Sequence, residues 1–317
     1  MDNAWEELLS EHVQEPLQKD ATSTAAIFCS PNRSSLQQVD KLFFCDTPSM
    51  DPCQSNFELL KFRSLVYKDS ISKTGQVKSS RDLDVYFLYT PFPGSTLDII
   101  ENIISARKNS VSNSFELQWH FVLDWAETDH RQWLNYLHSY FQELKERNLF
   151  PPSEKCATIW CINTDSIYSL LKSSTLWHTH HIDFIQQSLR VFCLFENCSL
   201  IYASLSKEDD KQFYRDLFRD AYENTPLPIE MASFTKLVIP HRSDTRELIK
   251  TLDEDFHIPA NLDAAFFEKY KEVLPLGGYA CDIASPTSDS ISPNIHDLLD
   301  EQYQLSKIYS KLSKSKV

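Results

Sequence analysis

Glycine is scarce in this sequence of 317 residues: there are four, Gly75, Gly94, Gly277 and Gly278. Ordinary usage would give about 22. Loops that grip phosphate groups depend on glycine, because the backbone must turn tightly and bring its N–H groups close to the oxygens. The stretch before Gly75 is therefore poorly suited to hold a nucleotide through such a loop.

Basic residues and long apolar runs are also scarce. Lysine and arginine total 31 against 45 acidic residues, for a net charge of −14, so we expect no nucleic-acid partner. No apolar run approaches the roughly 20 residues of a membrane span. The acidic start, "MDNAWEELLSEHV", is unlike a signal sequence, and the eight cysteines show no disulfide framework spacing. These features predict a soluble protein of the cytoplasm with reduced thiols.

What the sequence does contain is an alternation of short β-rich segments with longer segments of helical period. Near-continuous apolar runs are typical of parallel strands covered on both faces. Helical spacing of apolar residues marks 131–147, 181–195 and 207–224. The alternation predicts an α/β domain with a six-stranded, mostly parallel sheet and helices on both faces. The predicted strands are 25–29, 57–67 (an edge strand, because charges interrupt it), 84–90, 117–125, 157–165 and 199–204.

Helical arms are predicted at both ends of the chain. We divide it into an amphipathic arm (1–20), an α/β core (21–274), a Pro-, Ser- and Gly-rich linker (275–294) and a final helix (295–317). Two interpretations of the arms stay open: each covers its own domain, or each packs on a partner through an apolar face. The residues of these faces are Trp5, Leu8, Leu9, Leu298, Leu305, Ile308 and Leu312.

Residues 23–43, "STAAIFCSPNRSSLQQVDKLF", have the strand–loop–helix plan of a phosphate-binding loop. Such a loop needs the pattern G-x-x-x-x-G-K-[ST]. Aligning Ser34 with the terminal hydroxyl places Arg33 at the lysine and Asn32 at the second glycine. Only the hydroxyl is kept, and an arginine lacks the compact geometry of lysine. We therefore predict that Asn32, Arg33 and Ser34 are vestigial positions and that the protein needs no cofactor.

Two further nucleotide motifs are degenerate. In "INTD" (162–165), Asp165 stands where a base-reading carboxylate belongs, but Asn163 replaces the lysine of [NT]-K-x-D. For Asp165 we favour the interpretation that its carboxylate turns the chain by accepting a hydrogen bond from the backbone that follows it. At 89–94, "YTPFPG" lacks the carboxylate that holds Mg²⁺ through its water shell. Nucleotide hydrolysis is therefore not expected.

Other chemistry is weakly indicated. His178 and His181 have a metal-like spacing, yet without a second well-spaced pair they indicate a polar helix start, and we predict no metal. The sequence contains no G-x-S-x-G elbow of a hydrolase. Asp124 stands at a predicted strand end, where it can cap or turn the chain. The residues thus favour a scaffold over an enzyme.

One segment closely resembles a known family. "HHIDFIQQSLRVFCLFENCSLIYASLSKE" (180–208) is similar to the helix–strand segment of cytoplasmic dynein light intermediate chains, with a D-F-I-Q helix, an R-x-F-C-L end and an L-I-Y-x-S strand. Segments 3–11, 120–137, 236–244 and 299–314 resemble further elements of the family in the same order. The matching positions in 180–208 are Asp183, Phe184, Ile185, Gln186, Arg190, Phe192, Cys193, Leu194, Leu200, Ile201, Tyr202 and Ser204.

The resemblance implies a Ras-like G-domain fold in a subunit of a microtubule motor, located in the cytoplasm on the cytoskeleton. It implies binding to the dynein heavy-chain tail, with cargo adaptors as a second class of partner. Because the chain ends soon after 299–314, adaptor binding in the family's usual manner is not expected. Two alternatives stay open: a divergent GTPase or ATPase with an atypical phosphate loop, and a similar scaffold in another complex.

Overall fold

The computed structural model describes residues 23–276, apart from 45–59, 69–79, 90–96, 99, 103, 106–114, 128, 151–156, 207, 223–226, 232 and 234. The predicted arm 1–20, the linker beyond Leu276 and the helix 295–317 lie outside the described residues. All seven apolar arm positions lie outside them too, and they remain predictions: Trp5, Leu8, Leu9, Leu298, Leu305, Ile308 and Leu312.

Within the described residues, seven strands form one sheet in the order β2-β3-β1-β4-β5-β6-β7. Strands β3, β1, β4, β5 and β6 run parallel to one another, whereas β2 and β7 run antiparallel to them at the two edges. The strands are β1 (Ser23–Ser30), β2 (Leu60–Lys68), β3 (Ser80–Tyr89), β4 (Phe115–Asp124), β5 (Ala157–Ile162), β6 (Ser199–Ala203) and β7 (Leu237–Ile239). The six predicted strands and the mostly parallel sheet are confirmed, as is the edge position of β2.

Strand β7 was not predicted, because three residues are too few to show a period of two. The fifth strand also ends earlier than predicted, at Ile162 instead of residue 165. Asn163 has a φ of 56°, a left-handed conformation that breaks the extended chain and that asparagine tolerates better than most residues. The predicted strand end therefore forms the turn into the next helix.

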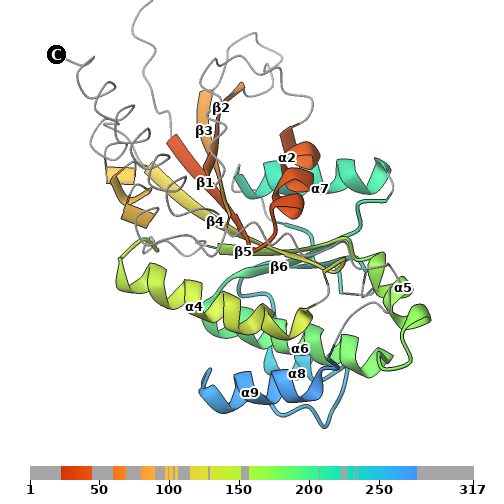
Figure 1. Ribbon diagram of the computed structural model, residues 1–317. Coiled ribbons are helices and arrows are strands. Elements are labelled where there is room, and N and C mark those ends of the chain that lie inside the picture. The colour runs from red at the N-terminus through yellow and green to blue at the C-terminus, as the bar shows by residue number, and fades with distance from the viewer. Residues whose placement is uncertain are drawn as a thin grey trace, which may run out of the picture. The chain divides into compact units, whose positions relative to one another are not determined.

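Helices cover both faces of the sheet (Figure 1). Helices α2 and α7 pack on one face, and α4 and α6 pack on the other, with α8 and α9 packed against α4 and α6 on that side. The bounds are α2 (Arg33–Phe44), the 3₁₀ turn η1 (His130–Gln132), α4 (Trp133–Glu146), α5 (Ser166–Ser173), α6 (Thr179–Glu196), α7 (Glu208–Tyr222), α8 (Arg246–Ile249) and α9 (Ala264–Val273). None of these described helices is long and apolar enough to cross a bilayer.

Strand β1 shows why the sequence of a central strand is continuously apolar. Its residues alternate between two cores: Ala25, Ile27 and Cys29 join the core under α4 and α6, and Ala26 and Phe28 join the core under α2 and α7. All five are at most 2% exposed. Because both faces are covered, every position of the strand contributes to hydrophobic burial.

Candidate functional site

Three hydrogen-bond donors of the loop between β1 and α2 are paired within the loop itself. The side-chain oxygen of Asn32 accepts from the backbone N–H of Ser34 at 2.9 Å and from the Ser34 hydroxyl at 2.9 Å. The backbone N–H of Asn32 donates to the Ser30 hydroxyl oxygen at 3.2 Å. A helix start binds phosphate through N–H groups that point at the ligand. Here Asn32 acts as the N-terminal cap, and an anion would have to displace it.

Arg33 also makes a contact within the domain. Its guanidinium lies 5.0 Å from the centre of the Tyr89 ring, a distance within the range of a cation–π contact. Tyr89 is the last residue of β3, next to the place where the sequence lacks a magnesium-binding carboxylate. The arginine that replaces the phosphate-binding lysine is therefore stacked on an aromatic ring.

Two carboxyl groups lie beside the same loop. Glu127 lies near Asn32 and Trp133, and Asp124 lies close enough to interact with it electrostatically. Burial, followed by the negative charge of Asp124, raises the pKa of Glu127 above its usual value. The same carboxylates would repel the negative charge of a phosphate group.

Asp124 joins three elements at this end of the sheet. One carboxylate oxygen accepts from the Ser35 hydroxyl of α2 at 2.7 Å. The other accepts from the backbone N–H of Ala126 at 2.9 Å and from the Asn163 amide at 2.8 Å. That amide also donates to Gln38 at 2.8 Å. Asp124 thus turns the chain, as predicted, and in addition ties α2 to the end of β5.

Asp165 lies in the turn that precedes α5, as predicted, but its side chain has a different partner from the one expected. Its carboxylate accepts a hydrogen bond from the Ser204 hydroxyl, just beyond the end of β6, instead of capping α5. Because β5 and β6 are parallel neighbours, their carboxyl ends place the two side chains together. Asn32 and Asp165, at two of the positions predicted to be vestigial, therefore both make hydrogen bonds within the domain.

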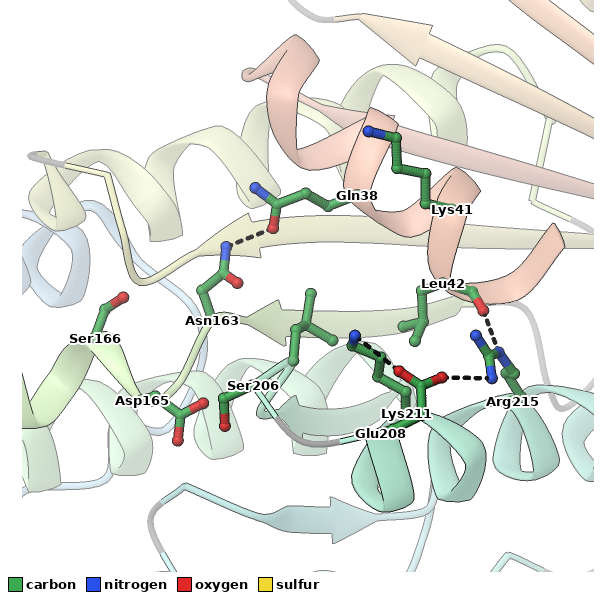
Figure 2. A pocket seen from close by; sticks show the side chains of 11 residues that line it. Gln38, Lys41, Leu42, Asn163, Asp165, Ser166, Ser206, Glu208, Lys211 and Arg215 are labelled. Carbon is green, nitrogen blue, oxygen red and sulfur yellow. Dashed lines mark hydrogen bonds and ion pairs between the residues drawn. The ribbon is translucent and has the colours of Figure 1, made fainter. Parts of the chain in front are cut away.

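A pocket of about 660 Å³ opens beside Asp165, between α2 and α7 (Figure 2). Its size falls in the range of small-molecule pockets, about 300–1,000 Å³. Figure 2 shows a polar end at Asp165 and Ser206 and a charged end at α7. The lining residues are Gln38, Lys41, Leu42, Asn163, Asp165, Ser166, Leu205, Ser206, Glu208, Lys211 and Arg215.

The charged end of the pocket is a compact ion cluster on α7. Glu208 accepts from the Lys211 ammonium at 3.0 Å and from the Arg215 guanidinium at 3.1 Å. Arg215 also donates to the backbone oxygen of Leu42 at 2.7 Å, near the end of α2. Sequence reasoning missed this cluster. The sequence indicates only that Glu208, Lys211 and Arg215 lie on one face of a helix, because of their spacing. The contact of this face with α2 is tertiary and leaves no pattern in the sequence.

The histidine-rich segment forms a helix start. The ring nitrogen Nδ1 of His181 accepts from the backbone N–H of His178 at 3.1 Å, at the start of α6. Burial, with smaller contributions from His180 and His178, lowers the pKa of His181 to about 4. Among the described residues, no group of three or more His, Cys, Asp or Glu side chains could hold a metal ion. The polar helix start predicted here is present.

The order of the strands, with antiparallel β2 outside β3 and with β1 between β3 and β4, defines a Ras-like α/β domain together with the loop after β1. A solved structure described as the conserved domain of the dynein light intermediate chain is similar to it, with a TM-score of 0.57 and 15% identity over 80% of this chain and 99% of that one. This likeness confirms the fold.

The sequence comparisons identify the family. The family pattern for the dynein light intermediate chain matches residues 156–269. The chain is 29% identical over 281 residues to the cytoplasmic dynein intermediate light chain DYN3 of Saccharomyces cerevisiae, covering 86% of this chain and 84% of the relative. It is 30% identical over 217 residues to its Candida glabrata counterpart, covering 66% and 65%. The chain belongs to the dynein light intermediate chain family, as its resemblance over 180–208 predicted.

Proposed function

We propose that this chain is a non-catalytic accessory subunit of cytoplasmic dynein, a pseudo-GTPase scaffold that binds the heavy-chain tail and supports microtubule-based transport in the cytoplasm. Membership of the family supports the subunit role, and yeast relatives are named as cytoplasmic dynein chains. The single observation that carries the scaffold role is the internal bonding of the loop between β1 and α2.

That bonding supports the absence of catalysis in a specific way. Asn32 caps the helix start that would receive a phosphate, and Glu127 with Asp124 adds negative charge beside it. A bound nucleotide would have to break the cap and overcome the repulsion before gaining any contact. Phosphoryl transfer depends on positioning and on charge stabilisation by a lysine and a metal. The chain offers Arg33 in place of the lysine, stacked on Tyr89.

The second candidate, a divergent GTPase or ATPase, is favoured by one observation: the pocket lies beside Asp165, the base-reading position. Calorimetry with GTP, GDP, ATP and ADP in the presence of Mg²⁺ separates the two candidates. We expect no binding tighter than millimolar. Micromolar binding that is abolished by Arg33→Ala with Ser34→Ala would establish the enzyme candidate and overturn the scaffold proposal.

Heavy-chain binding is tested with the purified tail of the heavy chain and the full chain described above, mixed at micromolar concentrations. We expect a stable complex on size-exclusion chromatography. Leu305→Asp with Ile308→Asp should weaken it, because both residues belong to the predicted apolar face of the final helix. Ser306→Asp, on the same predicted helix but off that face, is the matched control. Absence of a complex with the unmodified chain would refute the proposal. Cargo adaptors are a second class of partner for the same assay.

A further inference from the structure

The pocket between α2 and α7 has a local charge opposite in sign to that of the whole chain. Three basic side chains, Lys41, Lys211 and Arg215, and two acidic ones, Asp165 and Glu208, line it, whereas the net charge of the chain is −14. At physiological ionic strength, exposed charges more than about 8 Å away are largely screened. A group that enters the pocket therefore senses the five charged side chains that line it more strongly than acidic residues far from it. Asp209 and Asp210 follow Glu208 on α7, and Asp210 is paired with Lys236.

Lys211 and Arg215 are partly buried, whereas Glu208, the carboxylate that pairs with both of them, is exposed. The side chain of Glu208 is 68% exposed, but Lys211 is 32% and Arg215 is 22% exposed. Arg215 is fixed further by its bond to the backbone of Leu42. Hydrogen bonding to Lys211 lowers the pKa of Glu208 below its usual value. The position of Glu208 thus stabilises a carboxylate. The Glu208 side chain itself can move into water at little cost in free energy, because exposed ion pairs are weak.

We propose that this pocket binds the acidic side chains of a partner polypeptide, whose carboxylates take the place of Glu208 between Lys211 and Arg215. Lys41 lines the pocket from α2, and its ammonium points away from the Glu208 cluster in Figure 2. A rotation of its long side chain would bring it to a second carboxylate. Leu42 and Leu205 supply apolar surface for the methylene groups of such side chains. The inference rests on the proposed function, because it names a surface through which the scaffold would hold a partner.

Charge complementarity favours an acidic polypeptide over a nucleotide. A phosphate chain needs the helix start at Asn32, which is already capped, whereas the basic side chains lie further along α2 and on α7. Exchanging Glu208 for another carboxylate preserves the charge-assisted hydrogen bonds of both cations. The binding free energy from one acidic side chain is therefore modest, and it grows when several acidic residues of the partner bind along the pocket.

The first test uses fluorescence anisotropy with a labelled hexaglutamate peptide, and a hexaglutamine peptide as the neutral probe, on the full chain at low salt. We expect Lys41→Glu with Lys211→Glu to weaken hexaglutamate binding at least tenfold. Glu208→Gln should strengthen it several-fold, because it removes the internal competitor. Lys250→Glu with Lys269→Glu is the matched control: both lysines are exposed and lie in or beside α8 and α9, on the opposite face of the sheet.

Three results of this assay would overturn the inference. One is hexaglutamate affinity that falls equally in the pocket variant and in the control, since the effect would then be one of net charge alone. Another is hexaglutamine binding as tightly as hexaglutamate. The third is displacement of the peptide by inorganic phosphate with the same dependence on Lys41 and Lys211, which would make the pocket a site for small anions. Circular dichroism of each variant confirms that it is folded.

The second test repeats the heavy-chain assay with the same variants, so that the two proposals can fail separately. If the tail binds the unmodified chain but its affinity is unchanged by Lys41→Glu with Lys211→Glu, the role of the pocket in tail binding is refuted and the scaffold proposal stands. If hexaglutamate binds the pocket while the tail binds no variant, the pocket inference stands and heavy-chain binding is refuted.

Discussion

Removal of the Asp244 carboxylate is expected to destabilise the domain by about 3–5 kcal/mol, the usual cost of breaking a buried ion pair from one side. The Arg190 guanidinium of α6 meets this carboxylate through two hydrogen bonds of 2.7 Å. Arg190 is 3% and Asp244 is 9% exposed. The same carboxylate accepts from the backbone N–H of Thr245 at 2.9 Å. Asp244→Ala would therefore leave a positive charge buried without its partner.

The magnitude depends on what remains after the substitution. A fully exposed pair would be worth less than about 1 kcal/mol, but here water cannot replace the lost carboxylate. The double variant Arg190→Met with Asp244→Leu removes both charges and supplies apolar surface. Its cost is expected to be smaller than that of Asp244→Ala, because replacing both members of a buried pair is often close to neutral. The double variant should be more stable than the sum of the effects of Arg190→Met and Asp244→Leu alone predicts, by about 2 kcal/mol.

Urea unfolding followed by tryptophan fluorescence measures these values, since Trp119, Trp125, Trp133, Trp160 and Trp177 are all buried. Glu254→Ala, at an exposed turn position, is the control and should change stability by no more than about 0.5 kcal/mol. A loss below about 1 kcal/mol for Asp244→Ala, or a double variant less stable than Asp244→Ala, would refute the reasoning about the buried charge.

Three further predictions concern the interior. Burial lowers the pKa of His120 to about 3, so below pH 6.5 the unfolded chain binds more protons than the folded one, and stability falls as the pH drops from 6.5 towards 3. Between pH 6.5 and 5 His120 accounts for about 2 kcal/mol of this loss. His120→Phe should therefore flatten the slope of unfolding free energy against pH in that range, and an unchanged slope would contradict this. Asp124→Ala should cost about 2 kcal/mol or more, because Ser35 and the Asn163 amide lose their acceptor; a neutral result in the same urea assay would show that these bonds are dispensable. Burial raises the pKa of Cys29 and Cys161, so both should resist maleimide in the native state at pH 7 and react after unfolding, as measured by peptide mass spectrometry; rapid native labelling would contradict their burial.

Much of the fold was predictable because apolar periodicity reports burial directly. The central strands were found as continuous apolar runs, and β1 is buried on both faces, as its sequence requires. The edge strand β2 was recognised by its interspersed charges. The helices α5, α8 and α9 and the strand β7 were not predicted, since short elements are fixed by packing and by local caps such as Asp263, which accepts from the backbone N–H of Phe266.

The arrangement of side chains around the loop between β1 and α2 was only partly predictable. The sequence by itself determined that the loop before α2 lacks the glycines and the lysine of a phosphate-binding loop, because those properties belong to single residues. The tertiary structure alone decided what the remaining side chains do. Ser35 lies 89 positions and Asn163 lies 39 positions from Asp124 in the chain, and only the parallel sheet brings these partners within hydrogen-bond distance.

The same distinction applies to the pocket. The spacing of Glu208, Lys211 and Arg215 on one face of α7 follows from the helical repeat and is a property of the sequence. Their opposition to Lys41 depends on the packing of α2 beside α7 on one face of the sheet. Local sequence thus determined which residues could form a charged cluster, whereas the long-range packing of two helices decided that the cluster lines a pocket, because no local interaction holds segments so distant in the chain together.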